Sequence, residues 1–378
     1  MSETLVLTCE LIRRRSVTPD DAGCMDLIAE RLQPLDFTLE WLDFGETRNL
    51  YLRHGKSAPL LVLLGHTDVV PPGPLEEWRF PPFEPTFHEG QLYGRGAADM
   101  KSGIAAMVTA LQRFVGRYPA HRGSVAILLT SDEEGDARDG VVRVMKTFAA
   151  RGEKIDWCLI GEPSSFERLG DVIRVGRRGS LCGVLTVHGI QGHVAYPDLA
   201  DNPIHRFAPA LAELTAEVWD EGNAFFPPTR LQVSNIQAGT GAENVIPGRL
   251  DVSINFRYST AQTEDRLKQR VHAILDKHGV HYDLAWRLSG APFLTTGTEL
   301  IEATQAALET IVGQRARPDT GGGTSDGRFV APTGAEVLEL GLLNGTIHKI
   351  DERVPVADIG VLAEIYEQIL VNLLVAGP

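Results

Sequence analysis

The chain has 378 residues, 43% of them hydrophobic and 23% charged, and a formal net charge of -14. This length favours two domains over one, and the composition is ordinary for a globular protein. The negative charge argues against binding to nucleic acid or to an anionic membrane, but it leaves an acidic substrate open, because a few arginines can dominate the local field.

The first part of the chain alternates between helical and strand-like segments. Apolar residues recur at helical spacing over two N-terminal segments, and Thr18-Pro19-Asp20 is a start signal for the second. Continuous apolar runs predict buried strands. The Pro-rich, aromatic stretch 69–93 predicts an ordered irregular loop. The predicted helices are 3–15, 22–33, 103–115 and 140–150, and the predicted strands are 60–64, 125–129 and 157–160.

This alternation predicts an α/β fold whose catalytic domain has a mainly parallel sheet with helices on both faces. The pattern changes near Arg178. Two strand–helix units follow within about 110 residues, which predicts a small inserted α+β domain of ferredoxin-like type. Its predicted strands are 184–188 and 250–256, and its predicted helices are 202–216 and 263–278.

From Pro292 onward, the alternation of helices and apolar strands seen in the first part of the chain returns. The predicted helices are 298–313 and 356–375, and a strand is predicted around 337–340. We therefore expect one discontinuous domain interrupted by an inserted domain. The expected boundaries are 1–178 with 292–378 for the first domain, and 179–291 for the insertion.

The N-terminus lacks the basic and long apolar segments of a signal peptide, and no apolar run reaches the roughly 20 residues that span a bilayer. The cysteines are scattered and form no CxxC pair. We therefore expect a cytoplasmic protein with reduced thiols and no membrane partner. The cysteines are Cys9, Cys24, Cys158 and Cys182.

Six polar residues follow apolar, strand-like runs in short motifs. Open sheets of this class place their sites at the carboxyl ends of the strands. Two imidazoles and three carboxylates suffice to hold two divalent ions, with one carboxylate shared. The motifs are Gly65-His66-Thr67-Asp68, Gly94–Lys101 with Asp99, Ser131–Gly135 with Glu133 and Glu134, Gly161-Glu162-Pro163, and Thr346–Lys349 with His348.

We assign His66 and Glu162 to one metal ion and His348 and Glu134 to the other, with Asp99 shared between them. Two metals that share a water can supply hydroxide and also polarise the carbonyl of an unactivated amide. This inventory suits metal-assisted hydrolysis.

Two further carboxylates have expected roles beside the ligands. Glu133 is the expected general base, which takes a proton from the bridging water and delivers it to the leaving amine. Asp68 lies two residues from His66, and we expect its carboxylate to accept the second N–H of the imidazole and fix the tautomer. The Gly-rich loop 321–323 has no following Gly-Lys-Ser/Thr, which argues against a phosphate-binding loop.

Taken together, the motifs resemble those of the co-catalytic zinc metallopeptidase, or aminoacylase-like, family. This family includes aminoacylases, acetylornithine deacetylases, glutamate carboxypeptidases and enzymes that remove succinyl groups from diaminopimelate. The resemblance covers nearly the whole chain. The supporting stretches are Gly65–Pro71, Arg177–Leu181, Gly192–Pro197, Ala200–His205, Ser325–Phe329 and Asn344–Lys349.

The resemblance implies that the discontinuous domain is the catalytic, metal-binding domain. It also implies that the insertion is a dimerisation or lid domain, through which a homodimer is built. His193 of one subunit would then reach the partner's site and stabilise the oxyanion of the tetrahedral intermediate. It also implies a cis peptide between Asp99 and Met100. Two zinc ions per subunit are implied, although cobalt and manganese accept the same ligands.

The stretches at 192–205 and 325–329 resemble a narrower group within the family. That resemblance implies hydrolysis of N-succinyl-LL-2,6-diaminopimelate to succinate and LL-2,6-diaminopimelate, in lysine biosynthesis. Arginine binds carboxylates bidentately, so arginines are the candidates for gripping the substrate. The candidate arginines are Arg177, Arg178 and Arg257. The other candidate substrate-binding residues are Ser180, Tyr196, Asn244, Gly323, Thr324 and Asn344. The resemblance implies that Tyr196 and Asn244 reach the substrate from the partner chain.

Three alternatives remain. An acetylornithine deacetylase, or a related N-acyl-amino-acid amidohydrolase, would keep the metals and Glu133 but differ in the pocket arginines. An aminopeptidase would need an acidic anchor for the substrate's α-amine. A non-catalytic binding protein would be expected to lose Glu133 or several ligands, and all six residues are present here.

Overall fold

The computed structural model describes residues 1–375, which fall into two compact units. The first unit contains Met1–Gly176, Thr295–Asp319 and the chain from Ser325 onward. The second contains Arg177–Leu294 and the short segment Thr320–Thr324. The boundaries between the units therefore lie two or three residues from those expected from the sequence. In addition, a piece of the Gly-rich loop belongs to the second unit.

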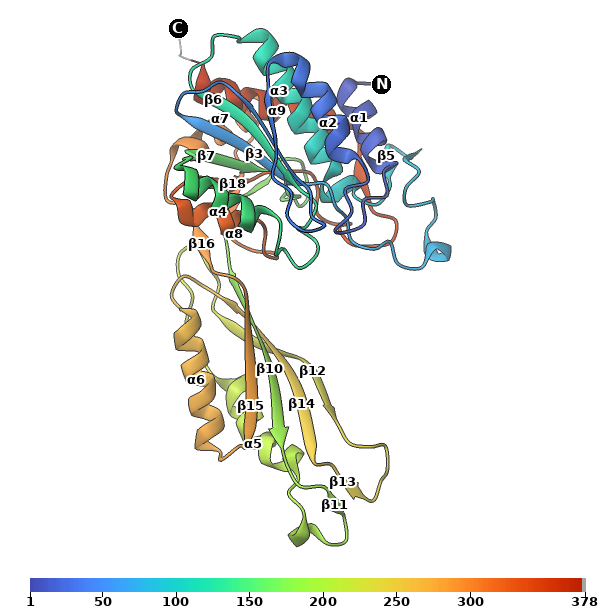
Figure 1. Cartoon of the computed structure of the whole chain (residues 1–378), viewed down its shortest axis with the longest axis vertical. Helices are drawn as coiled ribbons and strands as arrows, with labels where there is room; N and C mark the ends of the chain where they lie inside the picture. Colours follow the sequence, from blue (N-terminus) through green and yellow to red (C-terminus); the bar gives the residue numbers. More distant parts are fainter. Residues whose placement is uncertain (376–378) are drawn as a thin grey trace. The chain divides into compact units, whose positions relative to one another are not determined.

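An eight-stranded sheet forms the centre of the first unit (Figure 1), in the order β1-β2-β6-β3-β7-β18-β8-β17. Its middle strands β6, β3, β7 and β18 are parallel. Every residue of β3 and β6 is buried, which explains their continuous apolar sequences. The strands are β1 (Thr38–Trp41), β2 (Asn49–His54), β3 (Leu60–His66), β6 (Ser124–Thr130), β7 (Trp157–Ile160), β8 (Val172–Arg174), β17 (Arg317–Asp319) and β18 (Glu336–Glu339).

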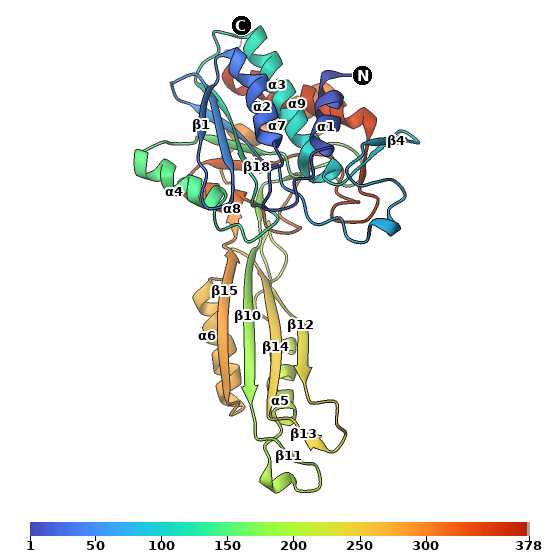
Figure 2. The ribbon, with the colours of Figure 1, turned by 45° about the vertical axis from the view of Figure 1, so that its right-hand side comes forward.

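Helices cover both faces of this sheet (Figure 2). On α4, the buried residues Val141, Val144, Met145 and Phe148 recur at helical spacing and form its apolar face. This arrangement confirms the α/β class expected from the sequence. One face carries α1 (Glu3–Ile12), α2 (Cys24–Leu32), α3 (Ser102–Arg117), α7 (Glu299–Val312) and α9 (Val356–Leu374), and the other carries α4 (Val141–Arg151) and α8 (Gly327–Val330).

The second expected helix, 22–33, is present as Cys24–Leu32, with Gly23 before it in a left-handed conformation and the Asp21 carboxylate accepting the Met25 N–H. The irregular loop expected over 69–93 is wrong in part. The stretch 69–93 contains a regular hairpin of β4 (Thr86–His88) and β5 (Gln91–Tyr93), and β19 (Arg353–Pro355) pairs with β5. Strands of three residues are too short to show an alternating pattern.

The second unit has βαββαβ connectivity, with an antiparallel sheet in the order β12-β14-β10-β15. This connectivity confirms the ferredoxin-like insert. Alternate residues of β14 are buried against the helices, as expected for a half-buried strand. The elements are β10 (Gly179–His188), α5 (Pro203–Ala216), β12 (Arg230–Ala238), β14 (Arg249–Tyr258), α6 (Glu264–Lys277) and β15 (Tyr282–Gly290), with the short strands β9 (Gly176–Arg177), β11 (Gly192–His193), β13 (Val245–Ile246) and β16 (Phe293–Leu294).

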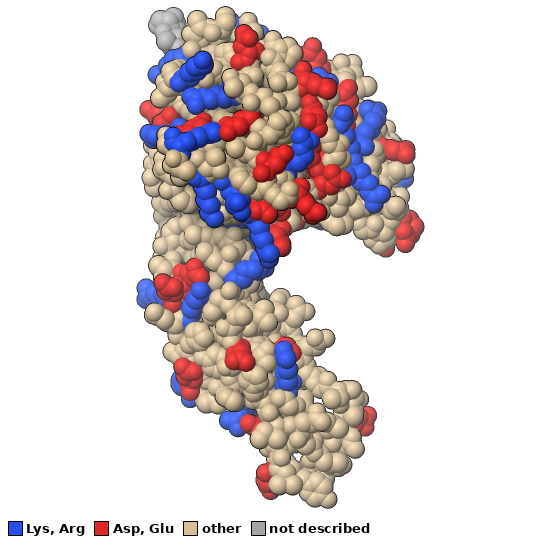
Figure 3. All heavy atoms as spheres, in the orientation of Figure 1, with Lys and Arg blue, Asp and Glu red and all other residues tan. Residues whose placement is uncertain are grey.

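The two units differ in surface character. Acidic and basic side chains are interspersed over the visible face of the first unit, whereas few charges lie on the visible face of the second (Figure 3). Within residues 1–375, no helix combines the length and the apolar character needed to cross a bilayer. The exposed large apolar residues of the second unit include Val184, Ile190, Val194, Tyr196, Leu199, Ile204 and Ile236.

Close packing of α3 on the sheet gives a stability prediction. A Cβ on Gly103 would lie 2.7 Å from the main-chain oxygen of Gly161, so Gly103→Ala should force α3 outward and lower the unfolding free energy by about 1–3 kcal/mol. The control is Gly116→Ala in the same helix, where no atom lies within 4 Å. It should raise the unfolding free energy by up to about 1 kcal/mol, because alanine favours helix. Equal urea-unfolding curves for the two variants would contradict this packing.

Candidate metal centre

His66 is the last residue of β3 and is only 1% exposed. Its Nδ1 donates to the main-chain oxygen of Asp68 at 2.9 Å, which fixes the tautomer and leaves Nε2 free for the site. Nε2 lies 3.1 Å from Oδ1 of Asp99 and 3.5 Å from Oε1 of Glu162, which follows β7. These three side chains converge at the carboxyl ends of two parallel strands.

The Asp99 carboxylate lies between the two histidines. Its Oδ1 faces His66, and its Oδ2 lies 3.3 Å from Nε2 of His348. The same His348 nitrogen lies 2.8 Å from Oε1 of Glu134. Asp99 belongs to the turn η3 (Ala97–Lys101), and the peptide between it and Met100 is cis, as the family resemblance implied. One carboxylate therefore offers one oxygen to each of two histidine groups.

Three sets of side chains place one potential ligand atom each within 4.8 Å of the others. Two of the sets share Asp99. Imidazole nitrogens and carboxylate oxygens are the donors that zinc, cobalt and manganese accept. The sets are His66, Asp99 and Glu162; Asp99, Glu134 and His348; and His66, Glu133 and Glu134.

The electrostatics of the cluster fit a cation. Burial, followed by the nearby Asp99 charge, raises the pKa of Glu162 to about 7. Burial, followed by the Glu162 charge, raises the pKa of Glu133 well above its usual range. Hydrogen bonds to Asp99 and Glu134 raise the pKa of His348 to about 10. These shifts all mark an excess of buried negative charge, which a divalent cation would relieve.

Asp68 has a different position from the one expected. Its carboxylate lies 3.6 Å from Nδ1 of His66, beyond hydrogen-bond distance, and its main-chain oxygen takes that role instead. The carboxylate accepts the main-chain N–H groups of Glu133 at 3.4 Å and Glu134 at 3.1 Å. These two hydrogen bonds to a completely buried carboxylate hold the turn that carries both glutamates.

One group of the expected substrate-binding residues lies where β10 begins. Arg177 donates to the Gly321 oxygen at 2.9 Å, and Arg178 donates to the Gly322 oxygen at 3.4 Å. Ser180 lies opposite Arg257 in the β10–β14 pair. Gly323 and Thr324 belong to the segment Thr320–Thr324 of the same unit.

A second group lies beyond the other end of β10. The rings of His193 and Tyr196 are 5.8 Å apart, and the N–H of Val194 donates to the Asn244 oxygen at 3.1 Å. Ser180 and His188 alone are separated by eight residues of extended strand, or about 26 Å. The structure therefore divides these residues between two ends of one sheet.

Asn344 is the one expected substrate-binding residue in the first unit. It lies between β18 and β19, is partly buried, and donates its main-chain N–H to the Ser165 oxygen at 2.9 Å. Because it is four residues before His348, it belongs to the same loop as a candidate metal ligand.

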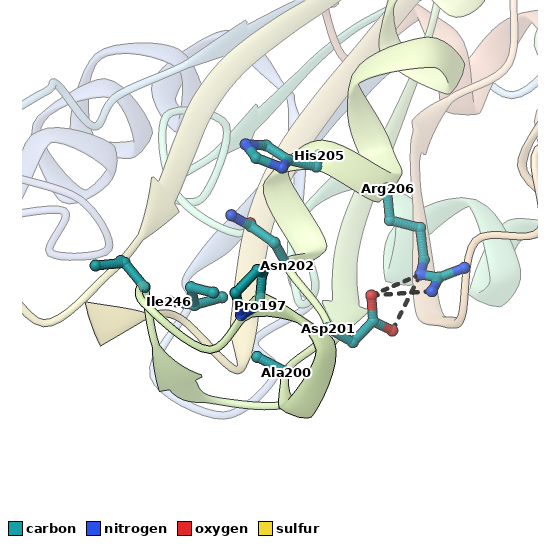
Figure 4. Close-up of a pocket in the computed structure, with 8 residues that line it drawn as sticks. Pro197, Ala200, Asp201, Asn202, His205, Arg206 and Ile246 are labelled. Atoms are coloured by element: carbon teal, nitrogen blue, oxygen red, sulfur yellow. Dashed lines mark hydrogen bonds and ion pairs between the residues drawn. The ribbon is translucent and has the colours of Figure 1, made fainter. Parts of the chain in front are cut away.

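A hollow of about 580 Å³ opens beside the start of α5 (Figure 4), and Val194, the residue after His193, is among those that line it. Asn202 caps α5 by accepting the Ile204 N–H at 3.0 Å, and Asp201 pairs with Arg206. The His205 side chain also borders the hollow. The stretch Ala200–His205 therefore has a structural role at this helix start.

Three buried charged residues around Asp99 were not identified from the sequence. Glu352 accepts hydrogen bonds from the Asp99 turn, Arg95 pairs with Glu352, and Lys101 donates to the Leu11 oxygen at 2.9 Å. Arg95 and Glu352 are separated by more than 250 residues in sequence. No local motif indicates such a contact.

Residues 62–372 match the family described as peptidase family M20/M25/M40. The chain belongs to this family. Its 374-residue alignment with succinyl-diaminopimelate desuccinylase from Methylococcus capsulatus is 68% identical and covers 99% of each chain. The protein of the same name from Thioalkalivibrio sulfidiphilus is 62% identical over 375 residues, covering 99% of this chain and 100% of the relative.

The fold of this M20 chain is similar to that of the M20 family metallo-carboxypeptidase from Sulfolobus solfataricus. The TM-score is 0.82, the sequence identity is 16%, and the match covers 99% of each chain. The family expected from the sequence motifs is thus confirmed.

The Asp68 carboxylate gives a test of the turn that carries the glutamates. Asp68→Asn should lower zinc affinity or kcat about 10- to 100-fold, because an amide NH₂ would face the N–H groups that the carboxylate now accepts. Isothermal titration with zinc and steady-state kinetics measure both quantities.

The matched control is Asp21→Asn. Asp21 is also buried, but it accepts hydrogen bonds from Thr67 and Met25 instead. It should lower thermal stability and leave zinc affinity unchanged. Equal losses of zinc affinity in both variants would show that Asp68 has no specific role in the centre.

Proposed function

We propose that this chain is a succinyl-diaminopimelate desuccinylase, which hydrolyses N-succinyl-LL-2,6-diaminopimelate to succinate and LL-2,6-diaminopimelate in lysine biosynthesis. The observation that carries the proposal is 68% identity over 374 residues with a protein of that name. The convergence of histidines and carboxylates on Asp99 supplies the chemistry of a metal-dependent amide hydrolase.

His66 and Glu162 would hold one divalent ion, His348 and Glu134 would hold the other, and Asp99 would contribute one oxygen to each. When bound, two such ions would polarise an amide carbonyl and lower the pKa of a water molecule, so that the water can supply hydroxide at neutral pH. We propose zinc as the metal, with cobalt or manganese as substitutes that accept the same donors.

Glu133 acts as the general base. It accepts a proton from the water that attacks the succinyl carbonyl carbon, and it then donates that proton to the amide nitrogen as the C–N bond breaks. Burial raises the pKa of Glu133, which brings the carboxyl group closer to the pH at which it must both accept and release a proton. Asp68 positions Glu133 through its main-chain N–H.

The substrate carries carboxylates at both ends. Arg177, Arg178 and Arg257 bind carboxylate groups in this proposal, because guanidinium groups can form paired hydrogen bonds with them. The other polar residues orient the substrate by hydrogen bonds. They are Ser180, Gly323, Thr324 and Asn344 from one chain, and Tyr196 and Asn244 from the partner.

The active enzyme in this proposal is a homodimer built through the second unit. The partner subunit's His193 stabilises the oxyanion that forms on the scissile carbonyl. The separation between the Ser180 and His193 groups supports sharing, because one substrate cannot contact both ends of a single ten-residue strand. The exposed apolar side chains of the second unit also fit burial against a second copy.

We also place the enzyme in the cytoplasm. The four cysteines are free in the structure, in keeping with reduced thiols.

The proposed function is tested by steady-state hydrolysis with zinc-reconstituted protein. We expect a strong kcat/KM preference for N-succinyl-LL-2,6-diaminopimelate over N-acetylornithine, because the second substrate lacks the succinyl carboxylate. Preference for the acetyl substrate would replace the proposal with an acetylornithine deacetylase and overturn the arginine assignment. Removal of the metal with a chelator should abolish turnover, and added zinc should restore it.

Site sharing is tested by mixing two inactive variants. Glu133→Ala removes the base and His193→Ala removes the oxyanion donor, so each homodimer should lose at least about 100-fold in kcat. A mixed dimer contains one site with both residues intact and should recover part of the activity. The absence of recovery in heterodimers verified by native mass spectrometry would overturn sharing.

A further inference from the structure

We propose that Glu352 is a positioning residue for the metal centre, which sets the place of Asp99 relative to His348. This inference rests on the proposed assignment of both residues as metal ligands. Glu352 has a buried carboxylate, 1% exposed, at the point where the His348 loop enters β19.

The carboxylate of Glu352 is fully engaged with the turn that carries Asp99. Its Oε1 accepts the N–H groups of Ala98 at 2.8 Å and Asp99 at 3.0 Å. Its Oε2 accepts the N–H of Gly96 at 2.9 Å and a guanidinium N–H of Arg95 at 2.7 Å. Four donors in so small a space match the acceptor capacity of an ionised carboxylate, and one of the four is charged.

Arg95 extends this contact to the His348 loop. Its Nη1 also donates to the main-chain oxygen of Lys349, the residue after His348, at 3.1 Å. Its guanidinium group stacks on Trp78, 5.1 Å from the ring centroid. Glu352 therefore binds the Asp99 turn, and Arg95 links Glu352 to the His348 loop.

The backbone of the His348 loop needs such support. His348 has a φ of 59°, a left-handed conformation that is costly for a residue other than glycine and persists where the surroundings enforce it. The pairing of β5 with β19 brings the two chain segments side by side, with Tyr93 opposite Arg353. Glu352 comes directly before Arg353, and its main-chain oxygen accepts the N–H of Gly94, the residue after Tyr93, at 3.0 Å. Arg95 follows Gly94, so both charged residues lie at this end of the strand pair.

This arrangement has a chemical consequence for the bridging carboxylate. Asp99 must present Oδ1 to the His66 group and Oδ2 to the His348 group at once. A small shift of its turn relative to the His348 loop would favour one group at the expense of the other. By binding both segments, Glu352 keeps the two halves of the centre in register.

The test compares Glu352→Gln with Glu153→Gln. Glutamine keeps the shape of the side chain but has one acceptor oxygen, and its NH₂ group would face main-chain donors. Glu153 is a matched carboxylate that binds Tyr51, Arg53 and Arg151. It follows α4, whereas the candidate ligands follow the carboxyl ends of the strands.

We expect Glu352→Gln to weaken the binding of one of two zinc ions about 10- to 100-fold in isothermal titration. The absorption spectrum of the cobalt-loaded protein should change as well, and kcat at saturating metal should fall while KM stays the same. Glu153→Gln should leave all of these unchanged. Glu352→Asp, which keeps the charge, should recover part of the metal affinity.

Wild-type affinity for both ions and an unaltered cobalt spectrum in Glu352→Gln would overturn the proposal. If that variant does not fold, Arg95→Lys decides instead. It keeps the charge but cannot reach both Glu352 and Lys349, and normal metal binding would again overturn the proposal. If the wild-type protein binds two ions but does not cleave the succinyl substrate, the proposed function is wrong. The metal affinities of Glu352→Gln and Glu153→Gln would still decide the role of Glu352. Failure of the wild type to bind divalent ions would overturn both.

Discussion

The geometry of the centre depends on one carboxylate, that of Asp99, whose two oxygens face two different imidazoles. His66 is delivered by the end of β3, in the middle of the sheet, and His348 by a loop near the end of the chain. Neither segment can move independently without changing one of these distances. The buried contacts around the Asp99 turn are therefore as much a part of the centre as the side chains that face it.

The parallel core of the first unit was predictable because its strands are buried on both faces and appear as uninterrupted apolar runs. The polar residues that end these runs were recognisable for the same reason. His66, Glu134 and Glu162 all follow parallel strands, and parallel strands bring their carboxyl ends to one edge. Chain order and strand direction together were enough to predict that these side chains meet.

Other features depend on contacts that sequence patterns do not carry. Strands β4 and β5 have only three residues each, and the edge strand β12 is mostly exposed. None of these three strands shows a regular burial pattern. We expected the Asp68 carboxylate to accept the second N–H of the His66 ring, but the main-chain oxygen of Asp68 accepts it instead. Glu352 contacts residues more than 250 positions away, and only the pairing of β5 with β19 makes that contact visible.

The position of β18 has a consequence for synthesis on the ribosome. This strand comes late in the chain but lies between β7 and β8, which belong to its first half. Until β18 is synthesised, the edges of β7 and β8 that face it have no strand to pair with. Because His348 follows β18, the complete centre can form only after the segment from β18 to His348 has been synthesised.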